Sequence, residues 1–224
     1  ILKLKFPKRD VRILKFIKGP VFTNNNVIWG NKVLTGNINY QITGISPFTD
    51  NKFATIGNDW ALPNKILNAK QIKQYKKIAS EIGKKLTKDG WKGLYGVDVI
   101  VDEKTKMLYL LEINARQPAS TTCESWLQKL TGKPGVSTFE AHLAGLLDLS
   151  NEKCKLIPII DGAQIIQRVT EKITEVFSPK IQDEALNNII RYKNSQPGAD
   201  LIRFQFSKSI MKKHNVLNSL GKKI

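Results

Sequence analysis

The sequence predicts an α+β fold in which an antiparallel sheet packs with helices. Residues 94–116 alternate apolar and polar side chains on both sides of a short turn, which is typical of a β-hairpin. Residues 65–88 repeat apolar side chains at offsets of three and four, which indicates an amphipathic helix. Residues 1–60 hold apolar runs separated by Gly, Pro and Asn, which predicts further short strands.

Composition narrows the class of protein. The 224 residues suffice for one large domain or two small ones, and 41% hydrophobic residues is ordinary for a globular chain. No apolar run approaches the ~20 residues of a membrane span, so we expect no membrane partner. The two cysteines do not suggest a disulfide framework, and a reduced cytoplasmic location is the default expectation.

The net charge of +17 leaves one further partner class open. Basic and acidic side chains are equal in number over 101–160, so the excess of lysine lies elsewhere in the chain. Lysines on the outer faces of the 65–88 helix are expected to be solvated. A nucleic acid or another polyanion stays open as an alternative partner.

The first sixty residues are expected to form most of the sheet. Short strands are expected at 11–17, 21–34 and 37–44. They are separated by Gly19 and Pro20, and the three asparagines at 24–26 suggest a turn. Residues 47–63 mix aromatic and small polar groups, which suggests an ordered loop that either touches substrate or packs over a sheet edge.

Two helices and a C-terminal segment complete the organisation. Gly90 and Gly93 end the 65–88 helix, and Ser137 with Glu140 forms a capping-box pattern that opens a helix to about residue 147. His142 on that helix is expected to be structural rather than catalytic. Residues 1–150 are therefore expected to form one domain, and residues 151–224 a small α+β subdomain.

The hairpin carries acidic side chains on one face. If Asp102 pairs with Leu108, then Asp98 faces Glu112, and Asn114 lies on the same face. Like charges opposite one another destabilise a sheet, and a bound cation reverses that effect. Three oxygen ligands suit Mg²⁺, which takes few carboxylates and completes its shell with substrate phosphates. The alternative is a solvated acidic face in a different register.

The same register places Ile100 opposite Leu110, beside the acids. An apolar pair of this kind could carry a flat base. The hairpin therefore suggests the floor of a magnesium–nucleotide site.

The hairpin also resembles a known metal-binding element. Gly-Val-Asp-Val-Ile-Val at 96–101, followed by Tyr-Leu-Leu-Glu-Ile-Asn-Ala-Arg at 109–116, is similar to the last hairpin of the ATP-grasp superfamily. That superfamily includes carbamoyl-phosphate synthetase, biotin carboxylase and D-alanine ligase. The resemblance implies that Glu112 and Asn114 hold Mg²⁺, or Mn²⁺, on the phosphates of ATP, with Asp98 as the acid of the preceding strand.

The resemblance implies further roles. Arg116 matches an arginine that contacts the transferred phosphoryl group or the acyl intermediate, so it is the expected catalytic residue. Ile100 matches an apolar residue under adenine, with Leu110 as its neighbour.

Residues 11–19 look like the hinge strand of the same superfamily. The resemblance implies that Leu14, Lys15, Phe16 and Ile17 contact adenine, mainly through main-chain groups. Leu14 and Lys15 stand where Glu is common, which leaves a main-chain role in place and removes an acidic one.

The resemblance covers residues 10–150 only. A first subdomain with a phosphate-binding Lys and a Gly-rich loop is expected before residue 10, so we expect the sequence to be a fragment, or a chain whose partner segment is missing. Ser120 stands where biotin carboxylase has an acid, and Glu124 is either its substitute or a residue of a helix surface. Bicarbonate chemistry of that type is therefore not expected.

The expected function is an ATP-dependent ligase that activates a small carboxylate as an acyl phosphate for attack by an amine or similar nucleophile. The alternative is a degenerate ATP-grasp domain that binds nucleotide or polyanion without catalysis.

Overall fold

The computed structural model describes residues 10, 13–150, 154–175 and 181–224. Within these residues the chain builds a nine-stranded sheet in the order β6-β5-β1-β3-β4-β7-β9-β8, with β2 paired to β1. The pairings between its strands are antiparallel. The strands are β1 (Val21–Trp29), β2 (Lys32–Leu34), β3 (Ile38–Thr43), β4 (Thr55–Asp59), β5 (Gly93–Val101), β6 (Leu108–Asn114), β7 (Ala163–Arg168), β8 (Leu186–Arg191) and β9 (Asp200–Phe206).

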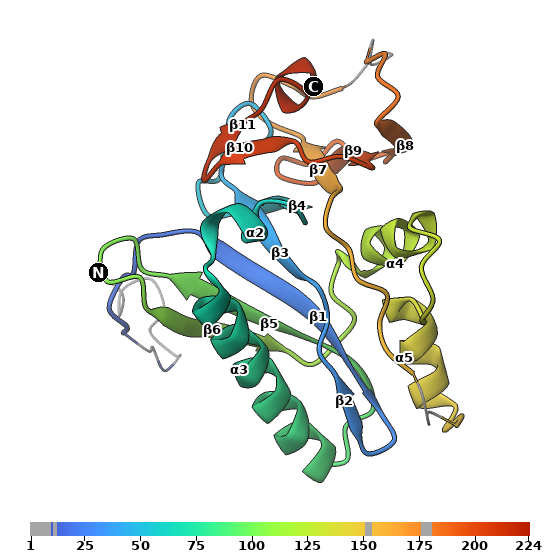
Figure 1. Ribbon diagram of the computed structural model, residues 1–224. Coiled ribbons are helices and arrows are strands. Elements are labelled where there is room, and N and C mark those ends of the chain that lie inside the picture. The colour runs from blue at the N-terminus through green and yellow to red at the C-terminus, as the bar shows by residue number, and fades with distance from the viewer. Residues whose placement is uncertain (1–9, 11–12, 151–153, 176–180) are drawn as a thin grey trace.

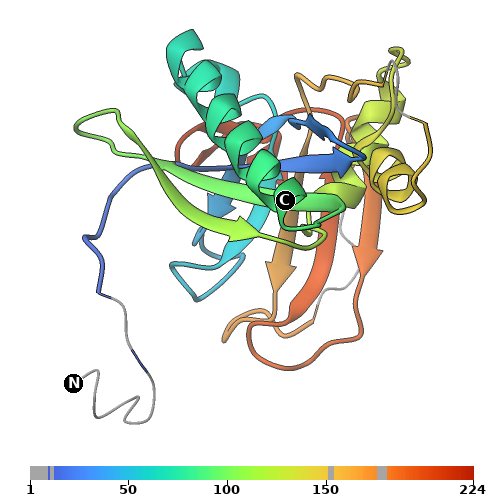
Figure 2. The same cartoon turned by 90° about the horizontal axis from the view of Figure 1, so that it is seen from below.

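The helices lie on both faces of this sheet (Figure 1). They are α2 (Pro63–Ile66), α3 (Ala69–Lys88), α4 (Thr121–Leu130) and α5 (Thr138–Leu146). Helix α5 packs against β1 and β5, while the tip of the β5–β6 hairpin points away from the α4–α5 pair (Figures 1 and 2). The expected α+β class with a large antiparallel sheet is confirmed.

Helix α3 covers one face and closes the main core. Its buried residues Tyr75, Ala79 and Gly83 repeat every four positions, so they form one stripe along the helix. Tyr75 packs in the same cluster as Phe22 and Val97, and its hydroxyl donates to the Val97 carbonyl at 2.6 Å. This face is therefore apolar and filled.

Helix α5 covers only part of the other face. Along β1 this face presents Thr23, Asn25, Val27 and Trp29 in turn, because alternate residues share a face. Val27 and Trp29 pack with Ala141 of α5. The half of the face that carries Thr23 lies beyond that cluster, and it is the half where the polar residues gather.

The strands after residue 150 extend the same sheet. β7 pairs with β4, and β9 and β8 follow outward. A small hairpin, β10 (Met211–Lys213) with β11 (Val216–Leu217), and the 3₁₀ turn Gly221–Lys223 end the chain. The division into domains 1–150 and 151–224 stays a prediction.

Several expected elements differ from the structure. The 65–88 helix is two helices, because Leu67 is extended between α2 and the Asn68 cap of α3. The turn expected at 24–26 is wrong, since these asparagines lie buried inside β1. Residues 13–17 of the expected first strand form no strand, and residues 11–12 lie outside the described part. Part of the loop expected at 47–63 is strand β4.

The expectation about the start of α5 is met. The capping box of α5 forms as expected, with the Ser137 side chain accepting from the Glu140 amide and Glu140 accepting from the Ser137 amide. Among the described residues, none of the helices combines the length and the apolar character that crossing a bilayer requires.

Candidate functional site

The register of the hairpin places the two acids opposite each other. Asp98 of β5 pairs with Glu112 of β6, and Gly96 pairs with Asn114, so the expected acidic pairing is confirmed. The register shifts by one residue between Asp98 and Val99, where β6 holds the extra residue Leu111. The pairing register on the tip side of this bulge therefore differs by one residue from the register at Asp98 and Glu112.

The expected pairing of Ile100 with Leu110 is wrong. Because of the bulge, Ile100 lies opposite Tyr109, and Leu110 lies opposite Val99. Ile100 is buried, whereas Leu110 is 46% exposed at the sheet edge. The contacts of Ile100 and Leu110 with adenine stay predictions.

A cavity of about 240 Å³ opens over the acidic pair. It is lined by Thr23, Gln41, Thr55, Asn58, Asp98, Glu112, Asn114, Arg116, Pro118, Ala119 and Ser120. The expected metal ligands Asp98, Glu112 and Asn114 and the expected catalytic Arg116 therefore meet at one cavity. The loop that follows Arg116 borders the cavity through Pro118, Ala119 and Ser120.

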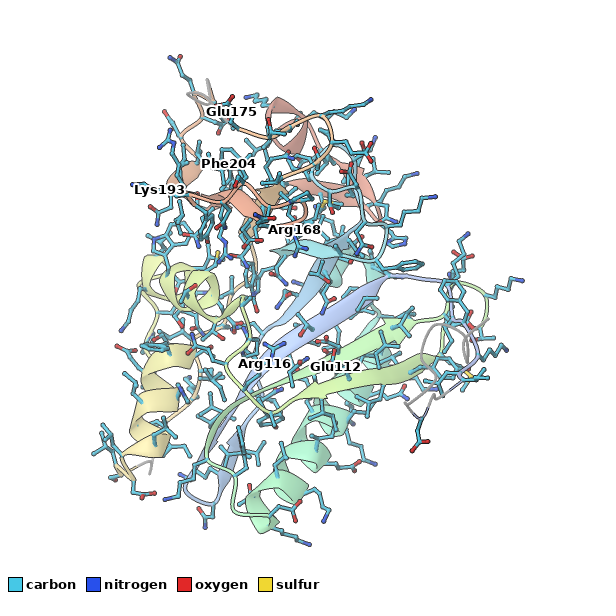
Figure 3. All side chains as sticks on the ribbon, turned by 180° about the vertical axis from the view of Figure 1, so that it is seen from behind. Glu112, Arg116, Arg168, Glu175, Lys193 and Phe204 are labelled. Atoms are coloured by element: carbon cyan, nitrogen blue, oxygen red, sulfur yellow. The ribbon has the colours of Figure 1, made fainter. Side chains whose placement is uncertain are left out.

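Hydrogen bonds connect three of these side chains. Arg116 Nη2 donates to Asn114 Oδ1 at 2.9 Å, and Asn114 Nδ2 lies 3.4 Å from Asp98 Oδ2 as donor. Glu112 and Arg116 are exposed, and Figure 3 shows both on the face of the sheet opposite α3. The acids and the guanidinium are thus within reach of a ligand that enters the cavity.

The groups around Asp98 compensate the negative charge of its carboxylate only in part. Burial raises the pKa of Asp98, and the nearby Glu112 carboxylate raises it further. Hydrogen bonds from Thr23 and Gln41 and the charge of Arg116 lower the same pKa without cancelling the rise. A cation between the two carboxylates would favour their charged forms.

The donor set fits a magnesium ion that brings its own ligands. Among the described residues there is no group of three or more His, Cys, Asp or Glu side chains that could hold a metal ion. Two carboxylates and one amide oxygen are the hard ligands that Mg²⁺ prefers, and this ion usually keeps water and substrate phosphate in its shell. Asp98, Glu112 and Asn114 are therefore suited to a metal–phosphate complex rather than to a bare ion.

The expected hinge residues lie apart from this cavity. Leu14 to Ile17 precede β1 without regular structure, and the side chains of Leu14 and Phe16 are 67% and 74% exposed. The next residues run along the end of β5, where the Glu103 amide donates to the Lys18 carbonyl at 2.9 Å. Adenine contacts by Leu14, Lys15, Phe16 and Ile17 stay predictions.

Comparison with solved structures identifies the architecture. A carboxyaminoimidazole ribonucleotide synthase from Aspergillus clavatus, in complex with ATP, matches 94% of this chain with a TM-score of 0.59 at 14% identity. An L-amino acid ligase from Bacillus licheniformis matches 87% with a TM-score of 0.60 at 16% identity. The fold is ATP-grasp-like. The expected resemblance is confirmed at the level of the fold.

The ATP-grasp-like chain covers only part of these structures. It spans 50% of the synthase and 48% of the amino acid ligase. A phosphoribosylglycinamide synthetase from Anaerococcus prevotii is covered to 49%, with a TM-score of 0.51 and 17% identity. No family model matches the sequence, and no curated protein matches it.

Sequence reasoning missed the residues that the ATP-grasp-like sheet adds to the cavity from its neighbouring strands. Thr23 of β1 pairs with Asp98, while Gln41 of β3 pairs with Asn58 of β4. Polar residues at alternate positions of a strand were the feature of the sequence that could have indicated these cavity residues. It was hidden because the neighbouring asparagines of β1 favour turns locally.

Glu124 is neither a cavity residue nor a surface residue. It is fully buried in α4, and its carboxylate accepts from Asn37 at 3.2 Å, from Thr138 at 3.1 Å and from the Asn25 amide. Asn25 also donates to Ser120, which lines the cavity, at 3.0 Å. Through Asn25, the buried Glu124 therefore helps to hold Ser120 in place at the wall of the cavity.

Proposed function

We propose that the chain is the metal- and phosphate-binding part of an ATP-dependent ligase that activates a small carboxylate as an acyl phosphate. The observation that carries the proposal is the placement of Asp98 opposite Glu112, with Asn114 and Arg116 linked to them around one cavity. The relatives in this fold include enzymes whose structures contain ATP or ADP. Carbon–nitrogen bond formation is the chemistry that best fits a ligase of this fold.

Each side chain has a role that follows from its position. Asp98, Glu112 and Asn114 would hold Mg²⁺ or Mn²⁺. The bound ion would neutralise charge on the phosphate oxygens. Arg116 lies beside Asn114 and is free on its solvent side to stabilise negative charge on the transferring phosphoryl group.

The carboxylate substrate attacks the γ-phosphorus of ATP, and ADP leaves. The acyl phosphate is then attacked by an amine, and inorganic phosphate leaves. Positioning and charge neutralisation supply most of the catalysis in such transfers.

Replacing Glu112 tests this proposal. Glu112→Gln removes one anionic ligand, so we expect magnesium-dependent ATP binding to weaken at least tenfold, about 1.4 kcal/mol. The folded chain should be no less stable, because the repulsion from Asp98 is relieved. Calorimetric titration of ATP with and without Mg²⁺ measures the first effect, and thermal unfolding measures the second.

Glu103→Gln is the matched control. Glu103 lies on the same hairpin but forms an ion pair with Lys18 and does not line the cavity. Equal ATP affinity in wild type and Glu112→Gln would refute the site assignment. Loss of acid-dependent ADP release should accompany the loss of affinity.

The exposed lysines of α3 favour a second candidate function, binding of a polyanion without catalysis. Lys73, Lys77, Lys84 and Lys88 are exposed along this helix. Binding of RNA that persists in Glu112→Gln, with no ADP release in wild type, would support that alternative.

A further inference from the structure

The cavity changes character away from the acidic pair. A row of hydrogen bonds leads from Asp98 to its hydrogen-bond partner Gln41, and the Thr55 hydroxyl donates to Gln41 Oε1 at 3.1 Å. The Thr55 carbonyl then accepts from Arg168 Nη2 at 3.0 Å. One end of this row is anionic, the middle is uncharged, and the far end is a guanidinium.

The uncharged part continues across the sheet as three linked amides. Gln164 Nε2 donates to Asn58 Oδ1 at 2.9 Å, and Asn58 Nδ2 donates to Asn39 Oδ1 at 2.7 Å. All three side chains are at most 6% exposed. The two terminal atoms of this series of amide side chains are Asn39 Nδ2 and Gln164 Oε1. Both are buried without a hydrogen-bond partner among the described residues.

Unpaired buried groups of this kind need a partner. Each costs on the order of 1–3 kcal/mol when it is left unsatisfied. They flank Asn58, which lines the cavity. A ligand with both a donor and an acceptor over Asn58 would complete this amide chain.

Arg168 is equipped to hold an anion at the far end. Its Nε is buried and makes no hydrogen bond within the described part of the chain, although Asp200 lies 3.7 Å away. Asp200 also pairs with Arg203 at 3.4 Å. Two guanidinium groups and one carboxylate leave one positive charge, which matches a carboxylate better than a doubly charged phosphate ester.

The distance across the sheet separates this anion from the reacting one. Arg168 lies on β7 and Asp98 on β5, and the order β5-β1-β3-β4-β7 puts four strand spacings between them. Four spacings amount to about 19 Å between the backbones. Figure 3 shows Arg168 well removed from Glu112 and Arg116. The same carboxylate cannot occupy both ends.

We propose that the uncharged side of the cavity binds the non-nucleotide substrate, which places a neutral polar group over Asn58. This substrate extends past Thr55 and carries a second carboxylate, which is held by Arg168 just outside the cavity lining. The inference rests on the proposed ligase function. The carboxylate has two possible sources: a dicarboxylic acid activated at its other end, or an amino acid that supplies the attacking amine.

The test uses matched pairs of probes that differ in one charge. The protein is loaded with Mg²⁺ and a non-hydrolysable ATP analogue, then titrated with glycine against glycinamide, and with the monoamide of glutarate against its diamide. The midpoint of thermal unfolding is the readout. We expect one carboxylate to stabilise the protein and its amide to be ineffective, and the responding pair identifies the source. Methyl phosphate is expected to bind more weakly than the carboxylate.

Variants assign the effect to Arg168. Arg168→Gln should raise the half-saturating carboxylate concentration at least tenfold, and Arg168→Lys should recover part of it through its charge. Arg191 is exposed on β8, which β9 separates from β7, so Arg191→Gln should behave as wild type. The affinity for Mg²⁺–ATP should be unchanged in all three.

Two results would overturn the inference. One is a wild type that distinguishes no carboxylate from its amide, and the other is an Arg168→Gln variant with unchanged half-saturation. Failure of the ligase proposal looks different, because it shows as Mg²⁺–ATP binding that does not depend on Glu112.

Discussion

At the scale of single residues, the most unusual group is the buried carboxyl of Glu124. Burial raises its pKa to about 7, because the loss of water outweighs the hydrogen bonds from Asn37, Asn25 and Thr138. The native state therefore favours the protonated form, while the unfolded chain ionises at the ordinary pKa of 4.5. Between these two values the folded protein holds the extra proton.

The consequence for stability has a definite sign. The contribution of Glu124 is present below pH 4.5 and is lost as pH rises to about 7, beyond which it stays constant. The size is on the order of 3 kcal/mol. Urea unfolding of wild type and Glu124→Gln at pH 5 and pH 8 measures it, and we expect the variant to lose less stability between the two.

The exposed Glu81 provides the control for this experiment. Glu81→Gln should keep the wild-type difference between the two pH values, since Glu81 lies on the solvent side of α3. Identical pH profiles for wild type and Glu124→Gln would show that the carboxyl titrates normally.

At the scale of elements, close contact between α3 and β5 depends on a missing side chain. A Cβ at Gly83 would lie 2.2 Å from the Tyr95 hydroxyl and 2.5 Å from a methyl group of Val33. The Tyr95 hydroxyl in turn donates to the Ala79 carbonyl at 2.8 Å. Glycine is thus retained inside a helix at a position where alanine would favour the helix by about 1 kcal/mol.

We expect Gly83→Ala to destabilise the protein despite this preference. Overpacking costs about 1–3 kcal/mol, and part of it is offset by the gain in helix propensity. The free energy of unfolding, measured by denaturant titration, should fall by up to about 2 kcal/mol. Lys84→Ala, one residue later on the exposed side, should change it by about 0.5 kcal/mol or less. A stabilised Gly83→Ala variant would contradict the packing argument.

The same scale shows how far a sequence predicts this fold. The amphipathic period predicted the buried stripe of α3. The pairing of Asp98 with Glu112 was predicted correctly from a wrong starting pair, Asp102 with Leu108: Val101 pairs with Leu108, and the bulge restores the facing of the two acids. The bulge at Leu111 was not predictable, because the run Leu108 to Leu111 is apolar throughout and carries no alternation.

The asparagines of β1 show why the rest of the site was missed. Asn24 and Asn26 bond to each other at 2.7 Å, and Asn25 bonds to Ser120, which is 95 positions away. Local turn preference cannot anticipate partners that only the folded chain supplies. The cavity residues of β3 and β4 depend on the same long-range pairing.

At the scale of the whole molecule, Asp59 ties the central sheet to the C-terminal hairpin. One of its oxygens accepts from the Ser209 hydroxyl at 2.7 Å and from the amides of Ile210 and Met211 at 3.0 Å. The other accepts from the amides of Ala61 and Leu62 at 3.0 and 2.9 Å. Asp59 is fully buried.

We expect Asp59→Asn to destabilise the whole chain. An amide offers one acceptor oxygen, so at least two buried donors lose their partner, which costs about 2–4 kcal/mol. Because β7 continues the sheet from β4, fluorescence and circular dichroism should report one coincident unfolding transition. Two separate transitions would show that the segments before and after residue 150 fold independently.

Asp50→Asn is the comparison for this variant. Asp50 is exposed and accepts one amide, that of Glu171, at 2.9 Å. Its replacement should therefore leave the unfolding midpoint almost unchanged.

The extra residue in β6 has a consequence for how this hairpin tolerates change in length. The tip, which turns over residues 102–107, sets the alignment from Val101 to Val99, and the bulge then resets it at Asp98. A one-residue insertion in the tip, paired with deletion of Leu111, would restore the same facing of Asp98 and Glu112. A change in the length of the exposed turn can thus be compensated at the position of Leu111. The facing of Asp98 and Glu112 is then kept.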